Sequence, residues 1–134
     1  RFLIFYVLGG LLAGLAQALL TPGSTVPSLG ASGAIAAVLG AYFFFFPRAR
    51  VTTFIPITFL PWFVEIPAVV YLGFWFISQL FSGVLALATA SGMNMGGVAW
   101  WAHIGGFVAG LILARPFAAG RRMRSLYLDE YYPW

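Results

Sequence analysis

Apolar residues fill four long stretches of this chain, and short segments rich in Pro, Gly and Arg separate them. A helix that spans a bilayer needs about 20 consecutive apolar residues, with a range of roughly 17–25. The pattern therefore predicts a bundle of four transmembrane helices, at about residues 2–20, 31–46, 67–88 and 98–114. We expect an all-α membrane protein.

Prolines set most of the predicted helix ends, because proline cannot continue a helix and restricts the residue before it. Helix ends are expected just before Pro22, Pro47 and Pro116. Pro67 suits the first turn of the third helix. The apolar segment 51–63 contains two prolines, so we expect a loop at the membrane interface there.

Composition supports the membrane assignment, since 62% of the residues are hydrophobic and only 7% are charged. Soluble domains carry about 25% charged residues. The absence of cysteine excludes disulfides, thiol catalysis and thiolate metal sites. The net charge of +4 comes from Arg residues that lie at segment ends rather than on one face, so a nucleic-acid partner is not expected. The lipid bilayer is the expected surrounding.

The arginines also predict the orientation of the chain. Four crossings place all of them on one side, namely Arg1, Arg48, Arg50, Arg115, Arg121, Arg122 and Arg124. Positive residues mark the cytoplasmic face, so both ends of the chain, including the tail 115–134, are expected in the cytoplasm. The loops 21–30 and 89–97 carry no charge and are expected outside. The chain begins with Arg1 and shows no signal-peptide pattern, so we interpret it as one domain over 1–134 that lacks upstream helices.

Small residues at a spacing of four predict the faces on which the helices pack, because close backbone approach stabilises helix pairs in lipid. Three predicted helices carry such rows: Gly10, Gly14 and Ala18; Ser32, Ala36 and Gly40, with Gly33, Ala37 and Ala41 beside them; and Ala102, Gly106 and Gly110. By helical periodicity His103 lies on a strip next to the last row.

Ser32 and His103 are predicted to lie at similar depths in the membrane. At about 1.5 Å per residue, Ser32 lies roughly 24 Å from Arg48 and His103 roughly 18 Å from Arg115. Both positions fall in the outer half of a hydrocarbon core of about 30 Å. Two complementary polar side chains at similar depth on packing faces indicate a site between helices.

His103 is the only histidine of the chain. An ionisable residue inside a membrane span is a functional hypothesis by default. The alternative is a neutral core histidine that is hydrogen-bonded to a backbone carbonyl. A metal ligand is the weaker functional reading, because no second histidine or nearby carboxylate offers a ligand set. Gln79 is interpreted as a residue that forms an interhelical hydrogen bond.

Ser32 lies in Gly30-Ala31-Ser32-Gly33 at the expected first turn of the second helix. Serines in membrane helices usually bond their own backbone or pack at interfaces. Here, however, the backbone N–H groups of the first turn lack intrahelical partners, and such groups stabilise the oxyanion of acyl transfer. We therefore expect Ser32 as a nucleophile, with the backbone at Gly30 and Ser32 supporting the oxyanion.

A serine nucleophile needs a base in contact, and His103 is the candidate. We expect the Ser32 hydroxyl within or slightly beyond hydrogen-bond reach of its ring. The carboxylates of Glu65, Asp129 and Glu130 all lie at or beyond the expected cytoplasmic boundary. The sequence therefore predicts a Ser-His dyad without a carboxylate.

The segments Gly30-Ala31-Ser32-Gly33-Ala34 and Ala102-His103-Ile104-Gly105-Gly106, which open two helices with one helix between them, resemble the rhomboid intramembrane proteases. The resemblance covers all four helices and relates them to the last four of a six-helix bacterial core. It implies Ser32 as nucleophile and His103 as general base, with helix 67–88 as a lateral substrate gate and loop 89–97, with Met93 and Met95, as a cap.

The same resemblance implies a serine endopeptidase of the bacterial cell membrane that cleaves transmembrane segments of other proteins and uses no cofactor or metal. The family also has a His and an Asn on an earlier helix that assist the oxyanion, and no residue of this chain corresponds to them. Asn94 is interpreted as an ordinary turn residue. The alternatives are an inactive relative that binds transmembrane segments, or a transporter or channel fragment, which would need polar residues along a path.

Overall fold

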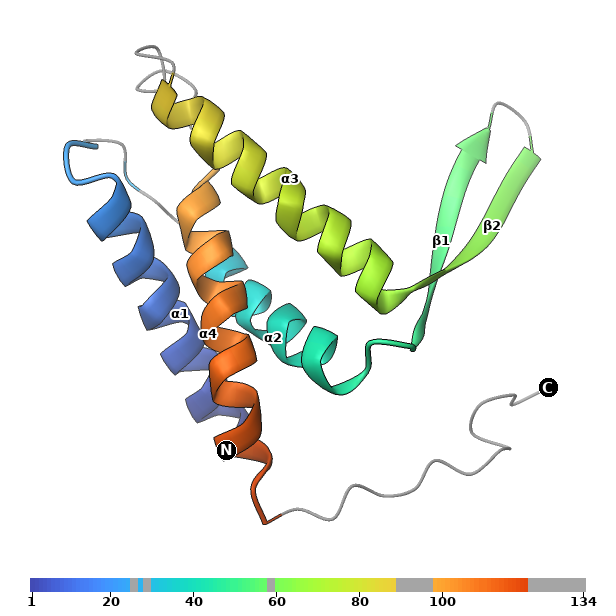
Figure 1. The fold of residues 1–134 in the computed structure, drawn as a ribbon, viewed down its shortest axis with the longest axis horizontal. Coiled ribbons are helices and arrows are strands. Elements are labelled where there is room, and N and C mark those ends of the chain that lie inside the picture. The colour runs from blue at the N-terminus through green and yellow to red at the C-terminus, as the bar shows by residue number, and fades with distance from the viewer. Residues whose placement is uncertain (25–26, 28–29, 58–59, 89–97, 121–134) are drawn as a thin grey trace.

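The computed structural model describes residues 1–24, 27, 30–57, 60–88 and 98–120. Its elements, in chain order, are α1 (Phe2–Leu20), α2 (Ser32–Phe45), β1 (Arg50–Ile57), β2 (Leu60–Pro67), α3 (Ala68–Ala88) and α4 (Trp100–Ala118) (Figure 1). The four predicted helices are confirmed. The predictions for the cap loop 89–97, with Met93, Asn94 and Met95, and for residues 121–134 of the tail lie outside the described residues.

Helix length separates α2 from the other three helices. Helices α1, α3 and α4 are each long and apolar enough to cross a membrane, whereas α2 has only 14 residues. At about 1.5 Å per residue α2 measures roughly 21 Å, less than a hydrocarbon core of about 30 Å. If Arg48, which follows the C-terminal end of α2, lies at one membrane surface, Ser32 at the other end of the helix lies within the core.

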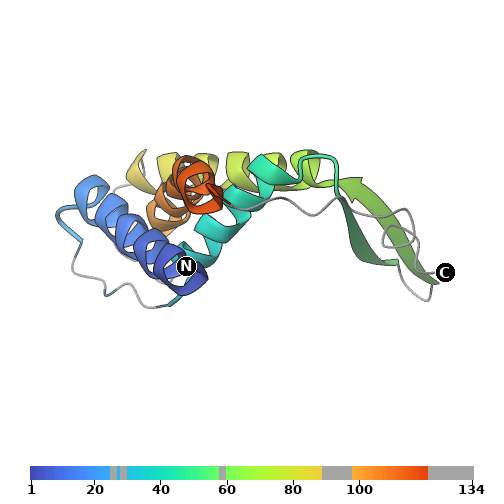
Figure 2. The same cartoon turned by 90° about the horizontal axis from the view of Figure 1, so that it is seen from below.

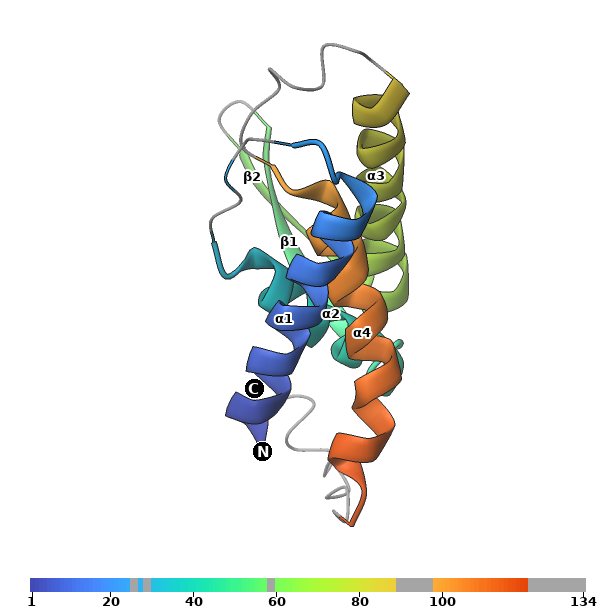
Figure 3. The ribbon, with the colours of Figure 1, turned by 90° about the vertical axis from the view of Figure 1, so that its left-hand side faces the viewer.

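Helix α4 is the centre of the helical bundle. It lies between α1 and α3 in Figures 1 and 3, and α2 packs against both α1 and α4. Helix α3 contacts the bundle mainly through α4. A buried apolar cluster joins α2, α3 and α4 through Ala36, Leu72 and Phe107.

Helices α2 and α4 cross at glycines. A Cβ atom added at Gly106 would overlap the carbonyl oxygen of Gly33, and one added at Gly110 would overlap the carbonyl oxygen of Ala37. At Gly40 it would overlap the carbonyl oxygen of Phe107 on α4. The predicted packing rows of these two helices are therefore confirmed except at Ser32, which is exposed. The absence of side chains at the glycines allows the backbones to approach closely.

In the predicted packing row of α1, Gly10 does lie at a helix contact, since an added Cβ would lie 3.3 Å from the Cβ of Ala34 on α2, but the rest of the row was wrong. Gly14 and Ala18 are exposed, and the buried residues of α1 are Phe5, Gly9 and Ala13. Gly9 and Gly10 are neighbours in sequence but point about 100° apart on a helix of 3.6 residues per turn. Both the row through Gly9 and Ala13 and the predicted row through Gly10 and Gly14 have a spacing of four, so spacing alone could not decide which row packs. The row through Gly9 is buried because it contacts both α2 and α4.

Helix α4 extends beyond its predicted end, through Pro116 to Ala118. A proline so near the end of a helix removes one hydrogen bond, and tertiary contacts can compensate for this loss. Phe117 packs edge-on against Phe5, with ring centroids 5.5 Å apart. The Arg1 guanidinium also donates a hydrogen bond of 3.2 Å to the carbonyl of Ala119.

The predicted interfacial loop 51–63 is instead most of an antiparallel β-hairpin, which adds a two-stranded sheet to the expected all-α fold. In Figure 2 the hairpin projects from one end of the bundle. β-Branched and aromatic residues favour strands, and proline is tolerated in strands that lie at a sheet edge. Both strands are edges here, so the opposed Pro56 and Pro61 are compatible with the ladder. Arg50 and Glu65 form an exposed ion pair of 3.0 Å at its base.

Candidate active site

Ser32 is the first residue of α2, as predicted. The chain enters the helix through Gly30, whose φ of +127° is rarely adopted by residues with side chains. Ala31 then serves as the N-cap residue. The Ser32 side chain is exposed. The turn at Gly30 therefore places the Ser32 hydroxyl at the N-terminal end of α2, outside the face that packs against α4.

The backbone around Ser32 offers hydrogen-bond donors. The first intrahelical hydrogen bond runs from the N–H of Ile35 to the carbonyl of Ala31, at 3.0 Å. The N–H groups of the residues between them, including that of Ser32, have no intrahelical acceptor. The helix dipole adds partial positive charge at the same end. This end of α2 can thus stabilise a negatively charged oxygen.

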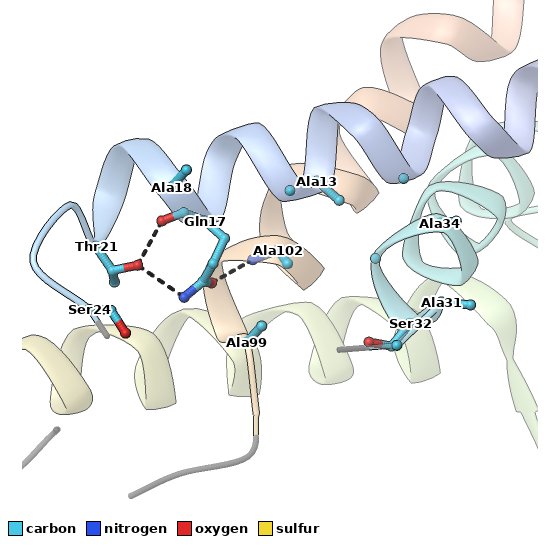
Figure 4. A pocket seen from close by; sticks show the side chains of 14 residues that line it. Ala13, Gln17, Ala18, Thr21, Ser24, Ala31, Ser32, Ala34, Ala99 and Ala102 are labelled. Atoms are coloured by element: carbon cyan, nitrogen blue, oxygen red, sulfur yellow. Dashed lines mark hydrogen bonds between the residues drawn. The ribbon is translucent and has the colours of Figure 1, made fainter. Parts of the chain in front are cut away.

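A cavity of about 360 Å³ lies in front of Ser32, between α1, α2 and the start of α4 (Figure 4). Figure 4 shows Ser32 on one side and Gln17 with Thr21 on the other. Small residues, among them Gly14 and Ala99, form much of the remaining wall. Thr21 and Gly30 line the cavity and belong to or border the 21–30 connection, so the cavity lies at that end of the bundle.

Gln17 connects α1 to the first turn of α4. Its Oε1 accepts a hydrogen bond of 3.1 Å from the N–H of Ala102. Its Nε2 donates to the hydroxyl of Thr21 at 3.1 Å, and that hydroxyl donates to the Gln17 carbonyl at 2.7 Å. Gln17 thereby fixes the backbone next to His103. The sequence signal for it was a polar residue in an otherwise apolar helix.

His103 lies in the first turn of α4 and is half-buried. Its Nδ1 lies 2.8 Å from Oε1 of Gln79 on α3. The ring centroids of Trp75 and Trp100 lie 5.9 Å and 6.4 Å from that of the imidazole. The ring therefore sits between α4 and α3, and its polar partner is a side-chain amide rather than the backbone carbonyl considered above.

The structure brings the helix starts that carry Ser32 and His103 together. Gly33 packs against Ala102, with the position of a Cβ on Gly33 lying 3.5 Å from the Ala102 carbonyl oxygen. Among the described residues, however, no hydrogen bond joins the Ser32 hydroxyl to the His103 ring. Ser32 faces the cavity between α1, α2 and α4, whereas the ring of His103 points toward α3.

The sequence did not predict which residue Gln79 is hydrogen-bonded to. Its role in an interhelical hydrogen bond is confirmed, but the partner turned out to be the candidate base. Within the described residues no carboxylate contacts His103, because Glu65 pairs with Arg50 in the hairpin. The same part of the chain contains no cluster of three or more residues suited to hold a metal ion.

Comparison with known proteins gives one match. The sequence model described as the Rhomboid domain matches residues 1–119. No curated protein and no solved structure matches the chain.

Proposed function

Because the chain belongs to the rhomboid family of integral membrane proteins, we propose that it is a serine endopeptidase that cleaves transmembrane segments of other membrane proteins. Ser32 is the nucleophile and His103 the general base. The observation that carries the proposal is the position of Ser32. Ser32 is the first residue of the short helix α2 and lines a cavity, and the backbone N–H groups beside it have no intrahelical acceptor.

In the proposed reaction the Ser32 hydroxyl attacks the scissile carbonyl while its proton passes to His103. The backbone at Gly30 and Ser32 stabilises the oxyanion, and the dipole of α2 supports the same charge. The leaving amine takes the proton from His103, and water then hydrolyses the acyl-enzyme. Ser32 is exposed, so its side chain can rotate toward the ring without repacking a core.

The proximity of Gly33 to Ala102 supports a direct transfer between the two side chains, because a Cβ position on Gly33 lies only 3.5 Å from the Ala102 carbonyl oxygen and the two helix starts are therefore neighbours. In the proposed topology the cavity and the 21–30 connection face outward, and Arg1 and Arg115 lie on the cytoplasmic side together with the rest of the tail. Water and the scissile segment enter from the outer side, past α3 as a lateral gate, in the membrane of a bacterial cell.

A second candidate is a rhomboid-like protein that binds transmembrane segments without cutting them. The observation that favours it is the missing hydrogen bond between the Ser32 hydroxyl and His103. In this reading the cavity and α3 bind the segment, and Ser32 is a polar wall residue.

A fluorophosphonate probe separates the two candidates, since only an activated serine reacts with it. In the full-length protein the probe should label the wild type, and both Ser32→Ala and His103→Ala should abolish labelling and cleavage of a transmembrane reporter, because either partner alone does little. Ser82→Ala on α3 is the control and should retain both. Cleavage that persists in both active-site variants, or a wild type that neither labels nor cleaves, would overturn the protease assignment.

A further inference from the structure

Gln79 is the one buried polar side chain among the described residues, with only 6% of its surface exposed. Helix α3 carries no charged residue, and most of its side chains are apolar. Burying an amide in an apolar bundle is unfavourable unless its hydrogen bonds are satisfied. The hydrogen-bond partners of the Gln79 amide therefore indicate its structural role.

A chain of three hydrogen bonds determines how the Gln79 amide is oriented. The Ser78 hydroxyl donates to the carbonyl of Trp75 at 2.6 Å, so its proton is engaged there. The oxygen of Ser78 must then accept, and the Nε2 of Gln79 lies 3.2 Å from it. The amide nitrogen thus faces Ser78, which leaves the amide oxygen facing His103.

This orientation assigns the proton on the His103 ring. An amide oxygen can only accept a hydrogen bond, so the Nδ1 atom that lies 2.8 Å from it must carry hydrogen. In the neutral ring the lone pair then resides on Nε2. That is the nitrogen through which a base hydrogen-bonded in this way takes the proton of a nucleophile.

We propose that Gln79 is a positioning residue that holds His103 with its proton on Nδ1 and its ring plane fixed between α3 and α4. This inference rests on the proposed function for its catalytic consequence, but not for the tautomer itself. Gln79 takes the place that a carboxylate has in a Ser-His-Asp triad and an amide has in Cys-His-Asn proteases. A neutral amide suits this position, because a buried carboxylate would require desolvation of a charge.

The rings around His103 strengthen the effect. Trp75 and Trp100 flank the imidazole at centroid distances of 5.9 Å and 6.4 Å. They restrict rotation of the ring and surround the hydrogen bond with apolar surface. A hydrogen bond in such an environment is electrostatically stronger than in water.

The test compares Gln79→Met, which keeps the size but removes the acceptor oxygen, with Gln79→Glu, which keeps an acceptor at the same reach. Gln79→Met should lower kcat for a transmembrane reporter by at least about tenfold with little change in KM, toward the ~10⁴-fold cost of a wrong tautomer in a serine protease triad. Gln79→Glu should cleave faster than Gln79→Met. Ile77→Met introduces the same residue on the exposed side of α3 and should cleave like the wild type.

A spectroscopic readout makes the inference independent of activity and of the folding of any Gln79 variant. In ¹⁵N-histidine spectra of the full-length protein, the signals assigned by their loss in His103→Ala should show a protonated Nδ1 and an unprotonated Nε2. A ring with its proton on Nε2, or a Gln79→Met variant with wild-type kcat, would overturn the inference. If the wild type shows the Nδ1–H ring but no cleavage, the protease assignment fails and the positioning contact stands.

Discussion

The imidazole Nδ1 of His103 on α4 and the amide Oε1 of Gln79 on α3 lie 2.8 Å apart and join the proposed base to the helix that the family resemblance marks as a gate. Helix α3 contacts the bundle mainly through α4, along a face formed by Leu72, Phe76, Gln79 and Gly83. A movement of α3 that admits a substrate would stretch or break this hydrogen bond. If α3 acts as the proposed gate, substrate entry and the orientation of the proposed base would be coupled through this contact.

A disulfide between α3 and α4 tests the gate. A Cβ atom on Gly83 would lie 3.5 Å from the Cβ of Trp100, which falls in the range of 3.5–4.5 Å that disulfides require. The reduced double variant Gly83→Cys, Trp100→Cys sets the baseline, because it already lacks the Trp100 ring beside His103. Oxidation should lower its cleavage of a transmembrane reporter well below this baseline, and reduction should restore the baseline rate. Labelling by a small fluorophosphonate should persist in both states. The chain has no other cysteine to interfere, and cleavage that is equal in both states would contradict a gating role for α3.

The helix crossing near the site makes a prediction about stability. Gly106→Ala should lower the free energy of unfolding by about 1–3 kcal/mol, as overpacking does, because the new Cβ would overlap the Gly33 carbonyl. Gly73→Ala on α3 is the matched control, since nothing lies within 4 Å of its added Cβ. It should be neutral or stabilising by roughly 0.5–1 kcal/mol, because alanine favours helix more than glycine does. Thermal unfolding in detergent measures both, and equal effects would contradict the crossing.

Much of this architecture could be predicted from the hydrophobic pattern, because a bilayer requires long apolar helices and small residues where helices touch. The bounds of α1 and the packing row through Gly106 and Gly110 followed directly. What failed depended on tertiary contacts. The Gly9 row of α1 was selected by two neighbouring helices, and the turn around Pro116 was stabilised by Phe5 and Arg1.

In the candidate site, too, local sequence predicted one feature, and another depended on tertiary contacts. The start of α2 at Ser32 was readable from local sequence, because the glycine that precedes it allows the turn. The partnership of His103 with Gln79 was not readable, because it depends on how α3 is rotated about its axis. Residues 24 positions apart in sequence give no periodic signal that relates the two faces.

The orientation of the chain is a prediction that rests on the arginines alone. Cysteines introduced singly at Gly23 and at Arg48 should react with a membrane-impermeant thiol reagent from opposite sides, with Gly23→Cys accessible from outside the cell. The positive-inside tendency gives this direction, and the absence of native cysteine makes the labelling unambiguous. Both variants should remain active, since neither residue lines the cavity. Labelling of both from the same side would contradict the topology.

The cavity in front of Ser32 makes the last prediction, which concerns access. Gly14 lines this cavity, and a Cβ added to it would meet nothing within 4 Å. Gly14→Leu should therefore fold normally and place a branched side chain in the space opposite Ser32. We expect the rate of fluorophosphonate labelling to fall by about tenfold or more, which corresponds to about 1.4 kcal/mol at the transition state.

The matched control for this variant is Gly73→Leu, which adds the same side chain at another open helical glycine outside the cavity. It should label at the wild-type rate. Thermal unfolding of both variants in detergent separates a blocked cavity from a damaged fold, because only the latter lowers the melting temperature together with labelling. If Gly14→Leu is as stable as Gly73→Leu and labels as fast as the wild type, the reagent reaches Ser32 by another route. The cavity between α1, α2 and α4 would then not be the path by which small reagents reach Ser32.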